Sequence, residues 1–201
     1  MAQQLTLALA GTIRHDGAGG VADDLGDVAG LAAWLHAQAP LLPEYAGDVG
    51  PLADTADEPT RLDVVAVRRA LRTLFAEAVR PGPPSRADSS ALLSTPEAVD
   101  RLNRAAAALP VRPVLRWPDG AGPSISWQGE AADARLRLTA GLARAAIEFL
   151  ASAAREQLRA CPAPRCVRYF VKDHPRQEWC KPSCGNRARV ARHYQRHTTA
   201  G

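Results

Sequence analysis

The chain has 201 residues, 46% of them hydrophobic, and carries 25 Lys and Arg against 21 Asp and Glu. This length supports one good core and a small appendage, and no apolar run approaches the roughly 18 residues of a membrane span. No basic residue precedes the apolar part of the N-terminal stretch MAQQLTLALAGTIRHDG, which therefore does not resemble a signal peptide. We expect a soluble cytoplasmic protein with reduced thiols and no membrane partner.

Two helices are predicted early in the chain. Asp27 is a favourable cap for a helix over residues 28–38, and Thr60 with Asp63 forms a capping box for a longer helix that reaches about Val79. Both helices have apolar residues at helical spacing, namely Leu31, Trp34 and Leu35 in the first, and Val64, Val67, Leu71, Leu74, Phe75 and Ala78 in the second.

Arg68 lies beside the apolar stripe of this second helix, where an exposed cation is not expected. One interpretation is that it binds an anionic small-molecule effector in a pocket of the helical region. The other, which we favour, is that it pairs with an acidic residue or extends to solvent.

Further along, Thr95 is expected to cap a third helix that has Pro96 in its first position and ends near residue 109. Partly alternating residues on both sides of a Pro/Gly-rich turn predict a β-hairpin over residues 112–128. A long, central helix should follow over residues 131–159 and continue into the C-terminal segment. Three tryptophans are expected in the core, namely Trp34 and the two hairpin residues Trp117 and Trp127.

The region up to residue 154 shows no constellation typical of an enzyme. It has no nucleophile elbow, no His-Glu-x-x-His helix and no phosphate-binding loop in a strand–helix context. We therefore expect a binding protein, not an enzyme.

All four cysteines lie in the last 41 residues, as Cys161-x4-Cys166-x13-Cys180-x3-Cys184. Two close pairs joined by a short connection are typical of a tetrahedral zinc site, and four sulfur ligands leave no open position for water or substrate. Two disulfides would suit an exported protein, and neither pair has the spacing of a thioredoxin-like redox site. We predict one structural zinc ion per chain.

Charge separates this C-terminal segment from the rest. Residues 155–201 carry 11 Lys and Arg against 3 Asp and Glu, whereas residues 1–154 carry 14 against 18. We therefore predict two domains, over residues 1–154 and 155–201, of which the second is basic enough to attract a polyanion.

The residues after the last cysteine have two predicted roles. Gly185 and Asn186 suit a tight turn, and a helix should begin near Asn186 with Arg187 facing the cysteines, so that Asn186 and Arg187 support the metal ligands. A basic outer surface should hold Arg189, Arg192, His193 and Arg196, joined by Arg165, Arg168 and Lys172, with Tyr169 and Phe170 interleaved.

No acidic residue occurs from Gly185 to the C-terminus, whereas a helix face that only meets solvent usually mixes both signs. Duplex DNA is the preferred partner of this basic surface. The alternatives are RNA, since aromatic residues among basic ones suit stacking on unpaired bases, an acidic protein partner, and a solvated surface.

The cysteine spacing and the run Cys184-Gly185-Asn186-Arg187 resemble the CGNR zinc finger, and the helical region before it resembles the ABATE domain. Together they cover nearly the whole chain. The resemblance implies a mainly α fold, in which a multi-helical N-terminal domain with a small β-hairpin precedes a four-cysteine zinc finger that ends in a helix. It also implies a bacterial, stress-induced transcription regulator. We expect the helical domain of such a regulator to sense a signal or to form a homodimer.

The opening of the chain departs from the resemblance. LTLALAGT is similar to the ABATE opening L-x-L-D-F-x-N-T, but Ala8 and Gly11 replace the acid and the asparagine. If those polar residues serve a ligand pocket in relatives, that pocket is altered or lost here.

Overall fold

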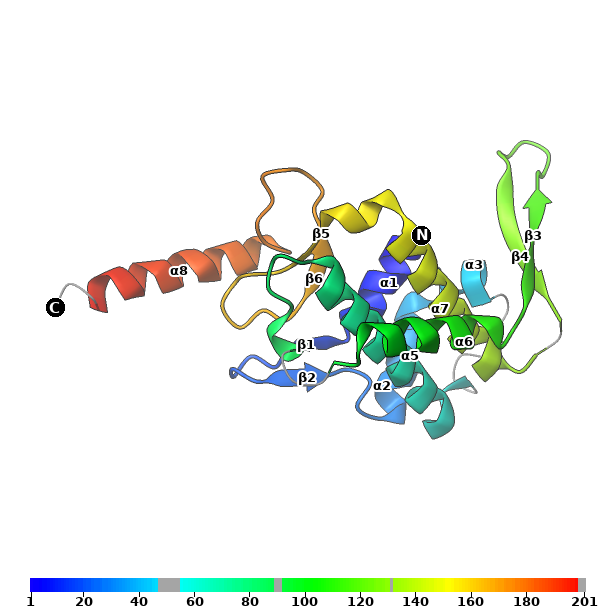
Figure 1. The fold of residues 1–201 in the computed structure, drawn as a ribbon, viewed down its shortest axis with the longest axis horizontal. Helices are drawn as coiled ribbons and strands as arrows, with labels where there is room; N and C mark the ends of the chain where they lie inside the picture. Colours follow the sequence, from blue (N-terminus) through cyan, green and yellow to red (C-terminus); the bar gives the residue numbers. More distant parts are fainter. Residues whose placement is uncertain (47–54, 89–91, 131, 199–201) are drawn as a thin grey trace.

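The computed structural model describes residues 1–46, 55–88, 92–130 and 132–198 (Figure 1). Helices dominate it, which confirms the mainly α prediction, and no helix in these ranges is long and apolar enough to cross a bilayer. The elements in chain order are α1 Ala2–Ala10, β1 Ile13–His15, β2 Val21–Asp23, α2 Val28–Gln38, α3 Leu42–Ala46, α5 Glu58–Ala78, η1 Arg86–Asp88, α6 Thr95–Ala107, β3 Val111–Arg116, β4 Ser124–Gly129, α7 Ala134–Ala151, η2 Ala153–Gln157, β5 Leu158–Ala160, β6 Tyr169–Val171 and α8 Pro182–Thr198.

The early helices form where predicted, with corrections at their caps. Asp27 caps α2, because its side chain accepts a hydrogen bond from the backbone N–H of Gly30. The cap of α5 is Asp57 and not Thr60, whose backbone N–H donates to the Asp57 carboxylate at 2.7 Å. Pro59, two residues after the cap, fits there because the N–H groups of the first helical turn are not used within the helix.

The third helix is also capped one residue earlier than predicted. Ser94 caps α6 and forms a capping box with Glu97, whereas Thr95 already has helical geometry. The serine hydroxyl and the glutamate carboxylate each satisfy a backbone donor that the first turn leaves free.

The long predicted helix is shorter than expected at its C-terminal end. α7 is capped by Asp133 and ends at Ala151, because Ser152 adopts an extended backbone and its hydroxyl donates to the carbonyl of Phe149. The chain then passes through η2 into strand β5. The predicted helical start at residue 131 falls outside the described part of the chain.

α7 is central, as predicted. It packs against α1, α3, α5 and α6, and the Phe75 ring of α5 meets the Phe149 ring of α7 edge-on at 5.6 Å between centroids. Helix α1 was not predicted, and it contributes the fully buried Leu5 and Leu9 to the same core.

The predicted hairpin is formed by β3 and β4, which pair antiparallel from Val111 opposite Gly129 to Arg116 opposite Ser124. Trp34 is buried as expected, but the expectation for Trp117 and Trp127 is wrong, since both are exposed. Figure 1 shows this hairpin at one end of the molecule and α8 at the other.

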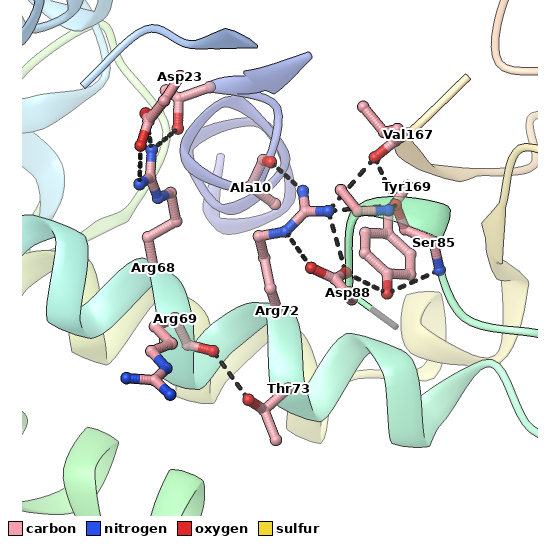
Figure 2. Close-up of polar contacts among 12 residues, drawn as sticks. Ala10, Asp23, Arg68, Arg69, Arg72, Thr73, Ser85, Asp88, Val167 and Tyr169 are labelled. Carbon is pink, nitrogen blue, oxygen red and sulfur yellow. Dashed lines mark hydrogen bonds and ion pairs between the residues drawn. The ribbon is translucent and has the colours of Figure 1, made fainter. Parts of the chain in front are cut away.

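The C-terminal segment is joined to the helical region through a buried ion pair (Figure 2). Arg72 of α5 donates from Nε and Nη2 to both carboxylate oxygens of Asp88 at 2.9 Å, and from Nη1 to the carbonyl of Ala10 at 2.6 Å. The Asp88 carboxylate also accepts the hydroxyl of Tyr169 in β6 at 2.7 Å. We call Arg72, Asp88, Ser85 and Tyr169 the junction cluster.

Further contacts complete the junction cluster. Ser85 donates from its hydroxyl to the carbonyl of Val167 at 2.8 Å and from its backbone N–H to the Tyr169 hydroxyl at 3.1 Å. The Tyr169 ring lies edge-on to Phe75, and its pKa is raised by burial and by the Asp88 charge. Tyr169 therefore belongs to the main core although it comes from the cysteine-containing segment.

Replacing Arg72 by Met should lower the free energy of unfolding by about 3–5 kcal/mol, because the Asp88 carboxylate then stays buried without its cation. Arg69→Met is the matched control, since Arg69 lies on the same helix with an exposed side chain that points away from the cluster (Figure 2). Its effect should stay below about 1 kcal/mol. Urea unfolding followed by circular dichroism measures both, and equal effects would contradict the role given to the buried pair.

Candidate functional site

The first cysteine pair lies in the loop of a short hairpin. Strands β5 and β6 pair from Leu158 opposite Val171 to Ala160 opposite Tyr169, and the Cys161 backbone N–H extends the ladder by donating to the Arg168 carbonyl at 2.9 Å. Within the loop the Cys166 N–H donates to the carbonyl of Ala163 at 3.0 Å. This turn directs both sulfurs to one side.

Arg165, immediately before the second of these cysteines, has a φ of 63°. A side chain other than glycine is uncommon in this left-handed region, which costs roughly 1–2 kcal/mol. The tight turn that brings Cys166 back toward Cys161 therefore holds the chain in a conformation it would not adopt alone.

The second pair is placed by the start of α8. Cys184 lies in the first turn of this helix, and its backbone N–H donates to the carbonyl of Lys181 at 3.0 Å. The prediction that the helix begins near Asn186, after a tight turn at Gly185, is therefore wrong. Helical geometry from Pro182 onward places Cys180 and Cys184 about one turn apart, with their sulfurs at 3.6 Å.

The four sulfurs converge. All lie within 4.8 Å of one another, with Cys166 and Cys180 at 3.7 Å, and the residues are buried or half-buried. A tetrahedral zinc ion with Zn–S bonds of about 2.3 Å would separate its sulfurs by about 3.8 Å, so the arrangement fits such an ion. A disulfide needs an S–S distance of about 2.05 Å, and all four cysteines are free thiols.

Electrostatics of this cysteine cluster favour shared negative charge. Hydrogen bonds from Cys161 and Cys180 lower the pKa of Cys166 to about 2, whereas the hydrogen bond to Cys166 raises the pKa of Cys161 to about 11. The pKa of Cys180 is raised through its hydrogen bonds to the same two sulfurs. The N-terminus of α8 adds a favourable positive potential beside Cys184.

Arg187 lies where the sequence predicted, facing the cysteines. Its Nη2 donates to the Sγ of Cys184 at 3.2 Å, and its Nε is buried with no hydrogen-bond partner among the described residues. Asn186 does not share this position, because it is exposed and its Oδ1 accepts a hydrogen bond from Arg189.

Trp179, the residue that precedes Cys180, packs against the cysteine cluster. Gly185 makes this contact feasible, since a Cβ at that position would lie 3.2 Å from the Trp179 ring. The close approach of the indole thus favours glycine at this position of the Cys-Gly-Asn-Arg run, since a Cβ would require the ring to shift by a few tenths of an ångström.

The outward part of α8 presents Arg189, Arg192 and His193, all exposed. The Arg192 guanidinium lies 6.0 Å from the centre of the Trp179 ring, at the limit of a cation–π contact. The side chain of Arg196, the fourth predicted member, lies outside the described residues. Val190 and Tyr194 of the same helix are exposed as well, because α8 extends beyond the body of the protein (Figure 1).

The segment around Cys161 and Cys166 contributes fewer exposed side chains to this basic surface than predicted. Arg165 and Arg168 are exposed, while Lys172 is half-buried and its Nζ donates to the carbonyl of Pro175. The interleaved aromatic residues were predicted wrongly, since Tyr169 belongs to the junction cluster and Phe170 packs on the cysteine cluster.

Arg68 pairs with an acid, which was the favoured interpretation. Its Nη1 and Nη2 donate to the two carboxylate oxygens of Asp23, and Nη1 also donates to the hydroxyl of Thr12. A pocket of about 260 Å³ with apolar walls that include Ile13 and Val65 opens beside it. The charge of Arg68 is therefore already compensated at this pocket.

Comparison with protein families matches the two parts of the chain to two models. Residues 3–153 match the ABATE model, described as "Putative stress-induced transcription regulator", and residues 157–197 match the CGNR zinc finger. A comparison with curated proteins found no match. The ABATE match spans most of the 201 residues and is followed directly by the finger that contains the cysteine cluster. The chain belongs to the ABATE family and carries a CGNR zinc finger at its C-terminal end.

Proposed function

We propose that this protein is a transcription regulator that binds duplex DNA through α8, and that one structural zinc ion on the cysteine cluster holds this helix in place. The observation that carries the proposal is the position of α8. It begins at the cysteine cluster and extends away from the body, with Arg189 and Arg192 exposed (Figure 1).

Charge and shape together support DNA as the partner. A single helix fits the major groove, and its cations release counterions from the phosphates. RNA is less favoured as the partner. Unpaired bases would stack on exposed aromatic rings, but Tyr169 and Phe170 are buried. We also propose that the protein binds without catalysing a reaction, since four sulfur ligands leave the metal no open position.

Zinc is required in this proposal because the finger has little core of its own. Its buried cluster consists of three of the cysteines with Ala163 and Phe170. Metal binding at such sites supplies on the order of 10 kcal/mol of folding free energy, which far exceeds what so few apolar contacts give.

Cys180→Ser should abolish stoichiometric zinc binding and unfold residues of the finger while the helical region stays folded. The helices up to α7 keep their own core, so most of the helical circular dichroism signal should persist. Metal analysis of protein purified under reducing conditions should give one zinc per parent chain. A parent without zinc, or one that contains a disulfide after reduction, would show that the cysteine cluster is not a metal site.

Arg187→Ala should weaken zinc binding about 10–100-fold, because Arg187 donates to the sulfur of Cys184. Arg189→Ala, two residues along α8 and exposed, is the matched control and should retain zinc with the parent's affinity. Competition with a chromophoric chelator measures both. Equal zinc affinities for the two variants would argue against a supporting role for Arg187.

Binding to duplex DNA should weaken steeply as the salt concentration rises. Each phosphate-contacting arginine removed from α8 should reduce the magnitude of the slope of log binding constant against log salt concentration by about 0.9. The combined Arg189, Arg192 and Arg196 alanine variant should therefore lose about 2.7 of slope while it retains zinc. Fluorescence anisotropy at several salt concentrations gives the slope.

The control for this measurement is Arg104→Ala, which removes an exposed cation from α6. Its slope should equal that of the parent. The DNA proposal fails if the triple variant binds as the parent does, or if the parent binds no duplex at low salt. Preferential binding of single-stranded RNA would support the alternative partner instead.

A further inference from the structure

The β3–β4 hairpin carries an apolar face whose outer part no described residue covers. Its largest members are highly exposed, with exposed fractions of 66% for Leu115, 69% for Trp117, 61% for Ile125 and 37% for Trp127. Figure 1 shows that the hairpin extends beyond the helical body, so the outer part of this face meets solvent in the isolated chain.

The pairing register places these residues on one side. Leu115 lies opposite Ile125, and the next pair on the same face is Pro113 opposite Trp127. Side chains alternate along a strand, so the intervening pairs form the other face, which is polar apart from Val114. Its pairs are Arg116 opposite Ser124, Val114 opposite Ser126 and Arg112 opposite Gln128.

Burial of this apolar face against a partner would stabilise the hairpin. An isolated two-stranded hairpin is marginally stable in water, and its exposed tryptophans and aliphatic side chains would be stabilised by burial. We propose that the apolar face of β3–β4 is the docking surface for a second copy of this chain, and that the two hairpins pack face to face about a two-fold axis.

The exposed area is sufficient for such a contact. If a large side chain offers on the order of 200 Å² when fully exposed, the four residues present roughly 500 Å² per protomer. Two copies would bury roughly 1,000 Å², which is about the lower limit for a specific interface. The dimer should therefore be weak and concentration-dependent.

The composition of the face suits a copy of itself. In a two-fold contact both partners use the same patch, so any charge in it would face a like charge. This face contains no charged residue and avoids that repulsion. Pro113 has no backbone N–H, and a proline in an edge strand is one of the features that disfavour lateral strand addition, which leaves face-to-face packing.

Charges at the two ends of the hairpin fit an antiparallel arrangement. Asp119 at the exposed tip forms no ion pair within the described chain, and at the base Arg144 donates to the carbonyls of Leu109 and Tyr45. Arg144 borders a pocket of about 170 Å³ beside Trp127, which Glu130 and Arg137 also line. With the hairpins antiparallel, each acidic tip would lie near the basic base of the other.

The test compares two neighbouring substitutions, Ile125→Glu on the apolar face and Ser124→Glu on the polar face. Both add one negative charge to β4, so they differ only in the face that receives it. In sedimentation velocity over a range of concentrations, the parent and Ser124→Glu should move from monomer to dimer, and Ile125→Glu should stay monomeric. Circular dichroism checks that all three remain folded.

A second readout follows the tryptophans. Acrylamide quenching of the parent should fall as its concentration rises, since Trp117 and Trp127 become covered, and quenching of Ile125→Glu should not change. A parent that stays monomeric, or an Ile125→Glu variant that dimerises like the parent, would overturn the proposal. The measurements contain no nucleic acid, so they stand or fall apart from the proposed DNA binding.

Discussion

The buried ion pair between Arg72 and Asp88 is the interaction on which the rest of the structure depends. It joins α5 to η1, to the end of α1 and to the finger strand β6 in one hydrogen-bonded group. A buried pair of this kind contributes little net stability over apolar residues, but removal of one partner is costly. Its value here is specificity of position, because the Tyr169 hydroxyl finds its acceptor in only one placement of the finger.

The finger is thus held from two sides. On one side, the junction cluster fixes the β5–β6 hairpin and hence Cys161 and Cys166; on the other, zinc would draw in the second pair and the start of α8. Because α8 has few apolar contacts beyond its first turns, its direction is set at this one end. The ion pair therefore fixes the first two cysteines on the body, and the metal would link α8 to those cysteines. The direction of α8 depends on both.

Much of this was accessible from the sequence. The cysteine spacing, the helix periodicity and the hairpin turn each follow from local chemistry, and the structure bears out the elements they predict. Trp117 and Trp127 could not be placed, since alternation identifies a hairpin face without showing whether anything covers it. Arg72 was missed although it follows Arg68 by four residues on the buried side of α5. Two arginines at that spacing beside an apolar stripe are a signal, but their partners Asp23 and Asp88 come from segments without helical periodicity.

The positions of the two surfaces constrain how they could act together. The β3–β4 hairpin and α8 lie at opposite ends of the long axis of the molecule (Figure 1). If the hairpins form the centre of a two-fold dimer, the two α8 helices lie at its outer ends. A dimer of this shape would bring its helices to separated half-sites and not to adjacent ones, because half-site spacing reflects the distance between recognition helices. The chain runs from the hairpin to α8 through α7 and the junction cluster. The rigidity of the Arg72–Asp88 ion pair in that cluster would then decide how constant the distance between the two α8 helices is.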